Sequence, residues 1–208
     1  MCTLAICKPV IRRTARVGDW VVGTGSKNSP IGDVSGCLVY AMKVTASMSM
    51  ADCDAWTAQQ LPAKVPSSSR SDNRRRLGDS IYDFSVDPPS QRDGVHGPEN
   101  VHTDLGGLNV LLSSHFYYFG DRPLLLPKSL LPIVKQGQGH RSWSNQPYIT
   151  DFVAWLEESQ APGIHGQPQL DLFQDETTAK SCALLRAQES IEDETLGEEP
   201  APTGPLVR

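Results

Sequence analysis

The sequence predicts an α+β domain built on a curved mixed sheet or a small β-barrel, with short helices flanking it. Short strand candidates outnumber helix candidates, and the connections between them are long and irregular. β-Branched and aromatic residues are concentrated in residues 17–23, 37–44 and 110–119, as is typical of strands. These features argue against a doubly wound α/β fold, in which strands and helices alternate regularly.

The expected elements follow in order along the chain. Residues 17–23 begin with a Gly–Asp turn and continue as a strand, and residues 37–44 are so apolar that we expect burial on both faces. Residues 48–60 carry apolar side chains at helical spacing and predict a short helix. Further on, the pattern predicts a short strand at 80–84, the strongest strand at 110–119 and an amphipathic helix at 149–158.

Charge divides the chain into two regions. Residues 1–150 contain 16 Lys and Arg against 12 Asp and Glu, whereas residues 151–208 contain 3 against 12. We therefore predict a domain at residues 1–166 and an acidic, largely disordered tail at 167–208, in which only 177–189 has a helical pattern. Within the domain, residues 62–76 have the composition of a mobile basic connector.

The composition also excludes several classes of protein. No apolar run approaches the roughly 20 residues that a membrane span needs, so we expect no membrane contact. The five cysteines are odd in number and scattered, which argues against a disulfide framework and indicates a cytoplasmic protein with reduced thiols. No Cys-x-x-Cys or His-x-x-x-His motif occurs, so we expect no metal and no cofactor. One loop contains His96, His102, Asp93, Glu99 and Asp104; these are residue types that bind metals, but a solvated polar loop explains them more simply.

Two glycine-containing loops offer phosphate-binding chemistry. Residues 135–142 place Gly137 and Gly139 beside a lysine, a histidine and an arginine, and residues 23–27 combine glycines with hydroxyls and a lysine. Glycine lets backbone N–H groups approach an anion closely, and flanking cations add positive charge. Neither loop matches a Walker or dinucleotide-binding motif, and a glycine turn with incidental basic neighbours is the alternative. Two such loops in one small domain favour an anionic or nucleotide ligand.

Four consecutive aromatic residues occupy positions 116–119. In a strand they alternate between the two faces, so two of them point inward and two outward. An outward aromatic ring can stack on a base, which contributes about 1–3 kcal/mol per base. Packing at a sheet edge or at a protein interface is the alternative and needs no ligand.

Several blocks of the sequence together resemble the second type of nucleotide modification associated domain. The blocks that carry the resemblance are Cys-Thr-Leu-Ala-Ile-Cys-Lys-Pro at 2–9, residues 11–23 and 38–44, Gly-Asp-Ser-Ile-Tyr at 78–82, Phe-Tyr-Tyr-Phe-Gly at 116–120, Gly-Gln-Gly-His-Arg at 137–141 and Pro-Gly-Ile-His-Gly at 162–166. The resemblance implies a role in bacterial or phage systems that make or handle modified nucleotides. The strand pair at 17–23 and 37–44 is also similar to the opening of PUA-like or EVE-like barrels, which hold a modified base in an aromatic pocket.

The first functional hypothesis is a domain that handles a nucleotide or nucleic acid, DNA in particular, and recognises a modified base. Its expected binding residues are Arg12, Arg13, Lys27 and Arg141 for phosphate, Tyr40, Tyr117 and Tyr118 for stacking, and Ser26, Gly137 and Gly139 in the two loops.

Two other functions remain open at this point. An enzyme of nucleotide modification needs a proton-transfer group, for which Asp79, Asp104, His115 and His140 are the candidates. A protein-interaction module would use its exposed aromatic residues to bind a protein partner from the same modification system.

Overall fold

The computed structural model describes residues 1–168 except 30 and 138. The strands are β1 (Cys2–Leu4), β2 (Trp20–Thr24), β3 (Cys37–Lys43), β4 (Ala46–Ser49), β5 (Tyr82–Asp83), β6 (Ser90–Gln91), β7 (Asn109–Ser113), β8 (His115–Tyr118), β9 (Leu124–Leu125) and β10 (Gly163–Ile164). The α-helices are α1 (Pro9–Thr14), α2 (Met50–Gln60), α3 (Asn73–Arg76), α4 (Val101–Leu105) and α5 (Ile149–Ser159). Short 3-10 helices are η1 (Pro62–Lys64), η2 (Pro98–Asn100), η3 (Lys128–Ile133) and η4 (Trp143–Tyr148). The α+β class and every strand and helix expected within residues 1–166 are confirmed.

The strands form three sheets. The largest has the order β10-β8-β3-β2, with β9 pairing the start of β3, and a second sheet has the order β1-β7-β4. The β10–β8 pair is parallel and the other pairs are antiparallel, so the largest sheet is mixed, as predicted. Its end strands, β2 and β10, do not pair with each other, and no sheet of the described residues closes into a barrel. Of the two architectures that the sequence left open, the chain adopts the open sheet, and the barrel expectation is wrong.

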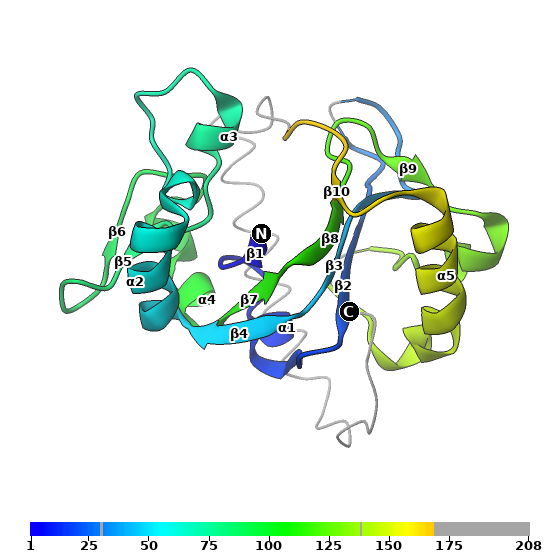
Figure 1. Ribbon diagram of the computed structural model, residues 1–208, viewed down its shortest axis with the longest axis horizontal. Coiled ribbons are helices and arrows are strands. Elements are labelled where there is room, and N and C mark those ends of the chain that lie inside the picture. Colours follow the sequence, from blue (N-terminus) through cyan, green and yellow to red (C-terminus); the bar gives the residue numbers. More distant parts are fainter. Residues whose placement is uncertain (30, 138, 169–208) are drawn as a thin grey trace.

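Two chain segments run from one sheet into the other. The strand expected at 110–119 divides at Ser114 into β7 and β8, and β3 continues through Val44 and Thr45 into β4. At this bend Ser114 N donates to Thr45 Oγ1 (3.0 Å), and Thr45 N donates to the Leu112 carbonyl (2.8 Å). The two sheets therefore lie between α2 and α4 at one end of the molecule and α5 at the other (Figure 1).

Apolar clusters fill both faces of the largest sheet. The cluster under α5 includes Trp20, Leu38, Ala41, Tyr117, Phe119, Phe152 and Leu156. On the opposite face, Met42 and Val21 pack with Ile11 of α1 and Leu111 of β7. Strand β3 contributes to both clusters, which confirms the burial expected from its apolar composition. A third cluster lies between the β1-β7-β4 sheet and helix α2.

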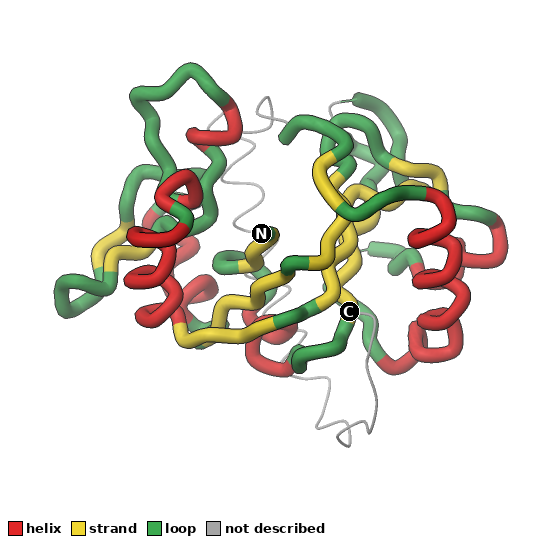
Figure 2. Tube along the Cα trace, viewed as in Figure 1, coloured by secondary structure: helices red, strands yellow, loops and turns green. Residues whose placement is uncertain are grey.

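The two longer helices have clear local causes. Helix α2 begins at Ser49, whose side chain accepts from Asp52 N (3.1 Å) and so satisfies one of the open amide groups at the helix start. Helix α5 buries Phe152 and Leu156, which are four residues apart and therefore lie on one face. Figure 2 shows both helices as separate coils on either side of the strands.

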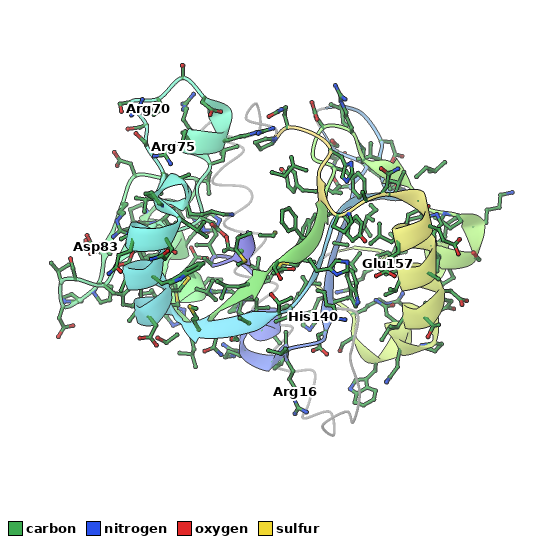
Figure 3. The ribbon with its side chains drawn as sticks, in the orientation of Figure 1. Arg16, Arg70, Arg75, Asp83, His140 and Glu157 are labelled. Carbon is green, nitrogen blue, oxygen red and sulfur yellow. The ribbon has the colours of Figure 1, made fainter. Side chains whose placement is uncertain are left out.

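The basic connector at 62–76 contains η1 and α3, and Arg75 Nη1 donates to the Pro62 carbonyl (3.1 Å). Figure 3 shows Arg70 and Arg75 at the α3 end of the molecule, away from the labelled His140. None of the described helices is long and apolar enough to cross a membrane. Apart from residues 167 and 168, the tail expected at 167–208 lies outside the described residues, as does its helical segment at 177–189.

Candidate functional site

The two glycine-containing loops meet at one cleft. The cleft has a volume of about 380 Å³, within the range of about 300–1,000 Å³ that is usual for small-ligand sites. From the first loop it is lined by Gly23, Gly25 and Ser26, and from the second by Lys135, Gly137, Gly139, His140 and Arg141. Lys8, Thr24, Tyr40 and Asn145 are further polar residues of its lining. Figure 3 labels His140 beside β2, which also lines the cleft.

The lining carries positive charge. Lys8, Lys135 and Arg141 are cations, and none of the described residues that line the cleft is acidic. Gly137 and Gly139 both have positive φ angles, 87° and 91°, a conformation that other residues rarely adopt. The cleft is therefore suited to an anion.

Asn145 lines this cleft and carries a buried polar atom without a partner among the described residues. Its residue is only 5 % exposed, and its side-chain Oδ1 accepts no hydrogen bond from any described residue. Because a buried carbonyl without a donor costs free energy, such an atom requires a donor, which an ordered water or a ligand can provide. A ligand N–H group is one such donor.

Tyr40 forms one wall of the cleft and depends on Gly23. Strands β2 and β3 place Gly23 opposite Tyr40, and a Cβ atom at Gly23 would lie 2.1 Å from Tyr40 Cε1. The ring therefore lies directly against the glycine backbone. Burial, together with the nearby Cys2 and Cys7, raises the pKa of Tyr40, so its hydroxyl stays protonated.

We expect Gly23→Ala to displace the Tyr40 ring and to lower the free energy of unfolding by about 1–3 kcal/mol, because the added methyl group overlaps the ring. Urea unfolding followed by tryptophan fluorescence measures this. Gly36→Ala is the matched control, since a Cβ there would meet nothing closer than 3.6 Å. Equal stability of the two variants would contradict the contact between Gly23 and Tyr40.

A cluster of three polar side chains, Cys7, His96 and Asp104, lies next to Lys8 in the structure. Cys7 Sγ is 3.2 Å from His96 Nε2, and His96 Nδ1 is 2.5 Å from Asp104 Oδ2. Asp104 is fully buried, His96 is 6 % exposed and Cys7 is half-buried. The three residues come from the turn before α1, the loop after β6 and helix α4.

The carboxylate of Asp104 organises this group. Its Oδ1 accepts from Cys7 N (2.7 Å), and its Oδ2 accepts from Tyr82 OH (3.0 Å) and faces His96. Burial and the neighbouring Asp104 raise the pKa of Tyr82, so the phenol remains a donor to the carboxylate. Burial acts to lower the pKa of His96, but its hydrogen bonds with Asp104 and Cys7 outweigh this and raise the pKa to about 9.

The same three side chains could also be considered as metal ligands, because their ligand atoms lie within 4.8 Å of one another. The contacts also fit a second arrangement. The sulfur faces Nε2 and the carboxylate faces Nδ1, so each ring nitrogen has a different partner. This is the pairing found in a hydrogen-bonded relay from sulfur through imidazole to carboxylate.

The remaining residues predicted from the sequence divide between the cleft and other places. Tyr40, Ser26, Gly137, Gly139, His140 and Arg141 line the cleft, whereas Arg13 and Lys27 are exposed outside its lining. Tyr117 is 1 % exposed and packs near Trp20, so it presents no face for stacking. Tyr118 lines a neighbouring depression with Thr24 and Ser26.

Arg12 differs most from its expected role. It is fully buried, and its guanidinium donates to the carbonyls of Cys7 (2.8 Å), Ala5 (2.9 Å), Asn109 (3.0 Å) and Asp104. It therefore has no surface to offer a phosphate. The guanidinium is held in the core because backbone carbonyls near the end of β1 and the end of α4 all point toward it.

The four proton-transfer candidates do not converge. Asp79 accepts from Thr3 Oγ1 (2.8 and 2.6 Å) and lies 3.6 Å from Lys64 Nζ. His115 Nε2 contacts Tyr117 OH (3.2 Å) and lies 3.8 Å from Glu157, outside the cleft. His140 lines the cleft, and Asp104 lies beside His96.

Sequence reasoning missed Cys7 and Asn145, and it considered His96 only as part of a polar loop, which the sequence interpreted as solvated. Cys7 and His96 are separated by 89 positions, so no local motif joins them. The one local feature of the sequence that could have drawn attention to Cys7 is its place two residues before Pro9, the first residue of helix α1. Asn145 gives no signal at all, because only its burial reveals the unpaired oxygen.

Fold and site together define an α+β domain with a cationic cleft beside a buried cysteine–histidine–aspartate group. The chain belongs to the nucleotide modification associated domain 2 family, whose model matches residues 1–176. This match confirms the resemblance found in the sequence and associates the chain with nucleotide modification. Searches of curated proteins and of solved structures gave no match.

Proposed function

We propose that this domain binds a nucleotide in the cleft between the two glycine-containing loops, as part of a nucleotide-modification system, and recognises its base. The observation that carries the proposal is the combination, in one cleft, of three cations, two left-handed glycines and no acidic residue among the described residues that line it. The family match supports the choice of a nucleotide among anions.

The cleft suits the two parts of a nucleotide. Lys8, Lys135 and Arg141 provide charge for the phosphate, and the left-handed Gly137 and Gly139 let backbone groups approach it closely. The Tyr40 ring offers an apolar surface for the base.

We assign recognition of the base to the side chain of Asn145. An amide oxygen accepts a hydrogen bond from a base amino or imino group, so Asn145 favours bases that carry such a donor at the edge facing it. A modified base would be read through the same edge. Because the side chain is buried, a base without the donor leaves the amide unpaired, which is the usual source of strong discrimination.

The proposal predicts that Arg141→Ala weakens binding of deoxynucleoside monophosphates, and of a fluorescein-labelled single-stranded DNA, by about 5- to 30-fold. The slope of the logarithm of the binding constant against the logarithm of the salt concentration should become shallower by about 1, because one phosphate contact is lost. Isothermal titration calorimetry and fluorescence anisotropy at several salt concentrations measure these effects. Binding of the monophosphates alone identifies a free nucleotide, and binding of the oligonucleotide alone identifies a nucleotide within DNA.

Arg13→Ala is the matched control. Both arginines are exposed and donate one hydrogen bond to a backbone carbonyl, Arg141 to Pro132 (3.1 Å) and Arg13 to Gly106 (2.8 Å), but only Arg141 lines the cleft. Equal effects of the two substitutions, or no affinity of the wild type for any probe, would overturn the proposal. Asn145→Leu tests base recognition separately, since it should change the order of affinities among the four monophosphates.

A further inference from the structure

In the group formed by Cys7, His96 and Asp104, the histidine contacts the cysteine with one ring nitrogen and the aspartate with the other, as in a catalytic triad. His96 contacts the sulfur through Nε2 (3.2 Å) and the carboxylate through Nδ1 (2.5 Å). In cysteine and serine enzymes the base touches the nucleophile with one ring nitrogen, and an acidic group orients it through the other. Such a constellation is recognised by its geometry and not by its order in the sequence, which here is cysteine, histidine, aspartate.

The backbone at the cysteine is held in an unusual conformation. Cys7 and Lys8 have φ angles of 57° and 40°, in the left-handed region that costs non-glycine residues of order 1–3 kcal/mol each. Both backbone groups of Cys7 are fixed: its N–H donates to Asp104 Oδ1 (2.7 Å), and its carbonyl accepts from Arg12 Nε (2.8 Å). Buried charged groups therefore hold a half-buried thiol on a strained turn, a feature common at functional sites.

The charge state of His96 fits the same role. With a pKa of about 9, which its hydrogen bonds with Asp104 and Cys7 produce against the effect of burial, His96 is an imidazolium at neutral pH. A cation 3.2 Å from the sulfur attracts the negative charge of a thiolate, which is the nucleophilic form of cysteine.

The group adjoins the cleft through Lys8, although none of its own three residues lines the cleft. Lys8, the residue after Cys7, lines the cleft, and so does Tyr40, which lies close enough to Cys7 for the two to interact electrostatically. The imidazole nitrogens and the carboxylate of the group have hydrogen-bond partners, and Cys7 is a half-buried residue.

We propose that Cys7 is the nucleophile of a cysteine–histidine–aspartate triad that transfers an acyl group from an ester or amide donor to water or an amine. His96 is the general base and acid, and Asp104 positions it. This activity goes beyond binding of a nucleotide in the cleft and does not depend on it; with a nucleotide bound, an amino group of that ligand is the acceptor.

The chemistry needs no oxidant or reductant. Cys7 sulfur attacks the carbonyl carbon of the donor, and the C–S bond forms as the carbonyl π electrons move to oxygen. Collapse of this intermediate breaks the bond to the alcohol or amine leaving group, which takes a proton from His96. In the second half, water or an amine loses a proton to His96 and attacks the thioester, and the C–S bond breaks to restore the sulfur.

The test uses p-nitrophenyl acetate, an activated acyl ester, with the full chain. We expect peptide mass spectrometry to find the acetyl group on Cys7, and steady release of p-nitrophenolate that falls by about 100-fold or more in Cys7→Ser and in His96→Gln. Cys37→Ala is the matched control: Cys37 is also half-buried, burial raises the pKa of its thiol, and it lies outside the group. Its loss should leave the rate unchanged.

A measurement on the wild type alone covers the case in which His96→Gln fails to fold. Iodoacetamide should alkylate Cys7 at least about tenfold faster than Cys37 below pH 7, because an imidazole nitrogen lies 3.2 Å from the Cys7 sulfur. Equal alkylation of the two cysteines, unchanged ester cleavage in Cys7→Ser, or a stoichiometric metal ion that wild type holds and Cys7→Ser loses, would each overturn the triad. Nucleotide binding by Cys7→Ser separates the two proposals: retained binding with no acyl transfer in the wild type contradicts the triad only, and acyl transfer without nucleotide binding contradicts the cleft only.

Discussion

Arg12→Met is expected to lower the free energy of unfolding by at least about 4 kcal/mol, because it removes the hydrogen bonds from the guanidinium to four backbone carbonyls, of which that of Asp104 keeps a second donor, Gly107 N (3.2 Å). A buried polar group left unpaired costs about 1–3 kcal/mol, and methionine fills much of the volume without replacing any donor. Gly107 packs against this guanidinium, since a Cβ there would lie 2.1 Å from Arg12 Cζ, so the site has little room to rearrange. Urea unfolding followed by tryptophan fluorescence measures the change.

Arg13→Met is the control for this substitution. Arg13 is the next residue of α1, is exposed, and makes one hydrogen bond to a backbone carbonyl. Its replacement should change stability by no more than about 0.5 kcal/mol. If both variants unfold at the same urea concentration as the wild type, the carbonyl groups around Arg12 do not depend on it.

The second large effect is a loss of stability between pH 6.5 and pH 9. The pKa of His96 rises from its ordinary value of 6.5 to about 9 in the folded protein, because the hydrogen bonds with Asp104 and Cys7 outweigh burial. A group whose pKa is raised on folding contributes stability that is fully present below 6.5 and is lost as the pH rises through 9. The shift corresponds to about 3 kcal/mol.

The measurement is the free energy of unfolding from pH 6 to pH 10 in wild type and in His96→Gln. The difference between the two proteins should be largest at the acidic end and should shrink as the pH rises. His165→Gln provides the control, since His165 stacks on Phe119 outside the group and its loss should leave the slope unchanged. A His96→Gln curve parallel to that of the wild type would show that the imidazole is not held as an imidazolium.

Both predictions concern residues whose surroundings the sequence does not reveal. Arg12 and Arg13 are adjacent and identical in type, yet one is fully buried and the other exposed. Nothing local separates them: the difference arises because the ends of β1 and α4 direct carbonyls to the Arg12 side of α1. His96 was placed in a solvated loop for the same reason, since only the packing of that loop against Asp104 and Tyr82 buries it.

The residues of the cleft were easier to predict from the sequence than the roles of Arg12 and His96. Glycines beside cations in a loop indicate an anion-binding turn from local chemistry alone, and both loops line the cleft. That they face the same cavity depends on η3 and η4, which bring residues 135–142 against β2. Asn145 lies in η4 and could not be distinguished from a surface asparagine before its burial was known.

By itself, the sequence determined the α+β class, the places of the main strands and helices, the two glycine-containing loops and the family resemblance. These depend on side-chain periodicity and turn chemistry, which act over a few residues. Only the tertiary structure decided that the sheet stays open, that Arg12 supports the core, and that Cys7 meets His96 and Asp104. Contacts between residues about 90 positions apart are set by packing and by pairing of buried polar groups, and neither leaves a pattern in the neighbouring sequence.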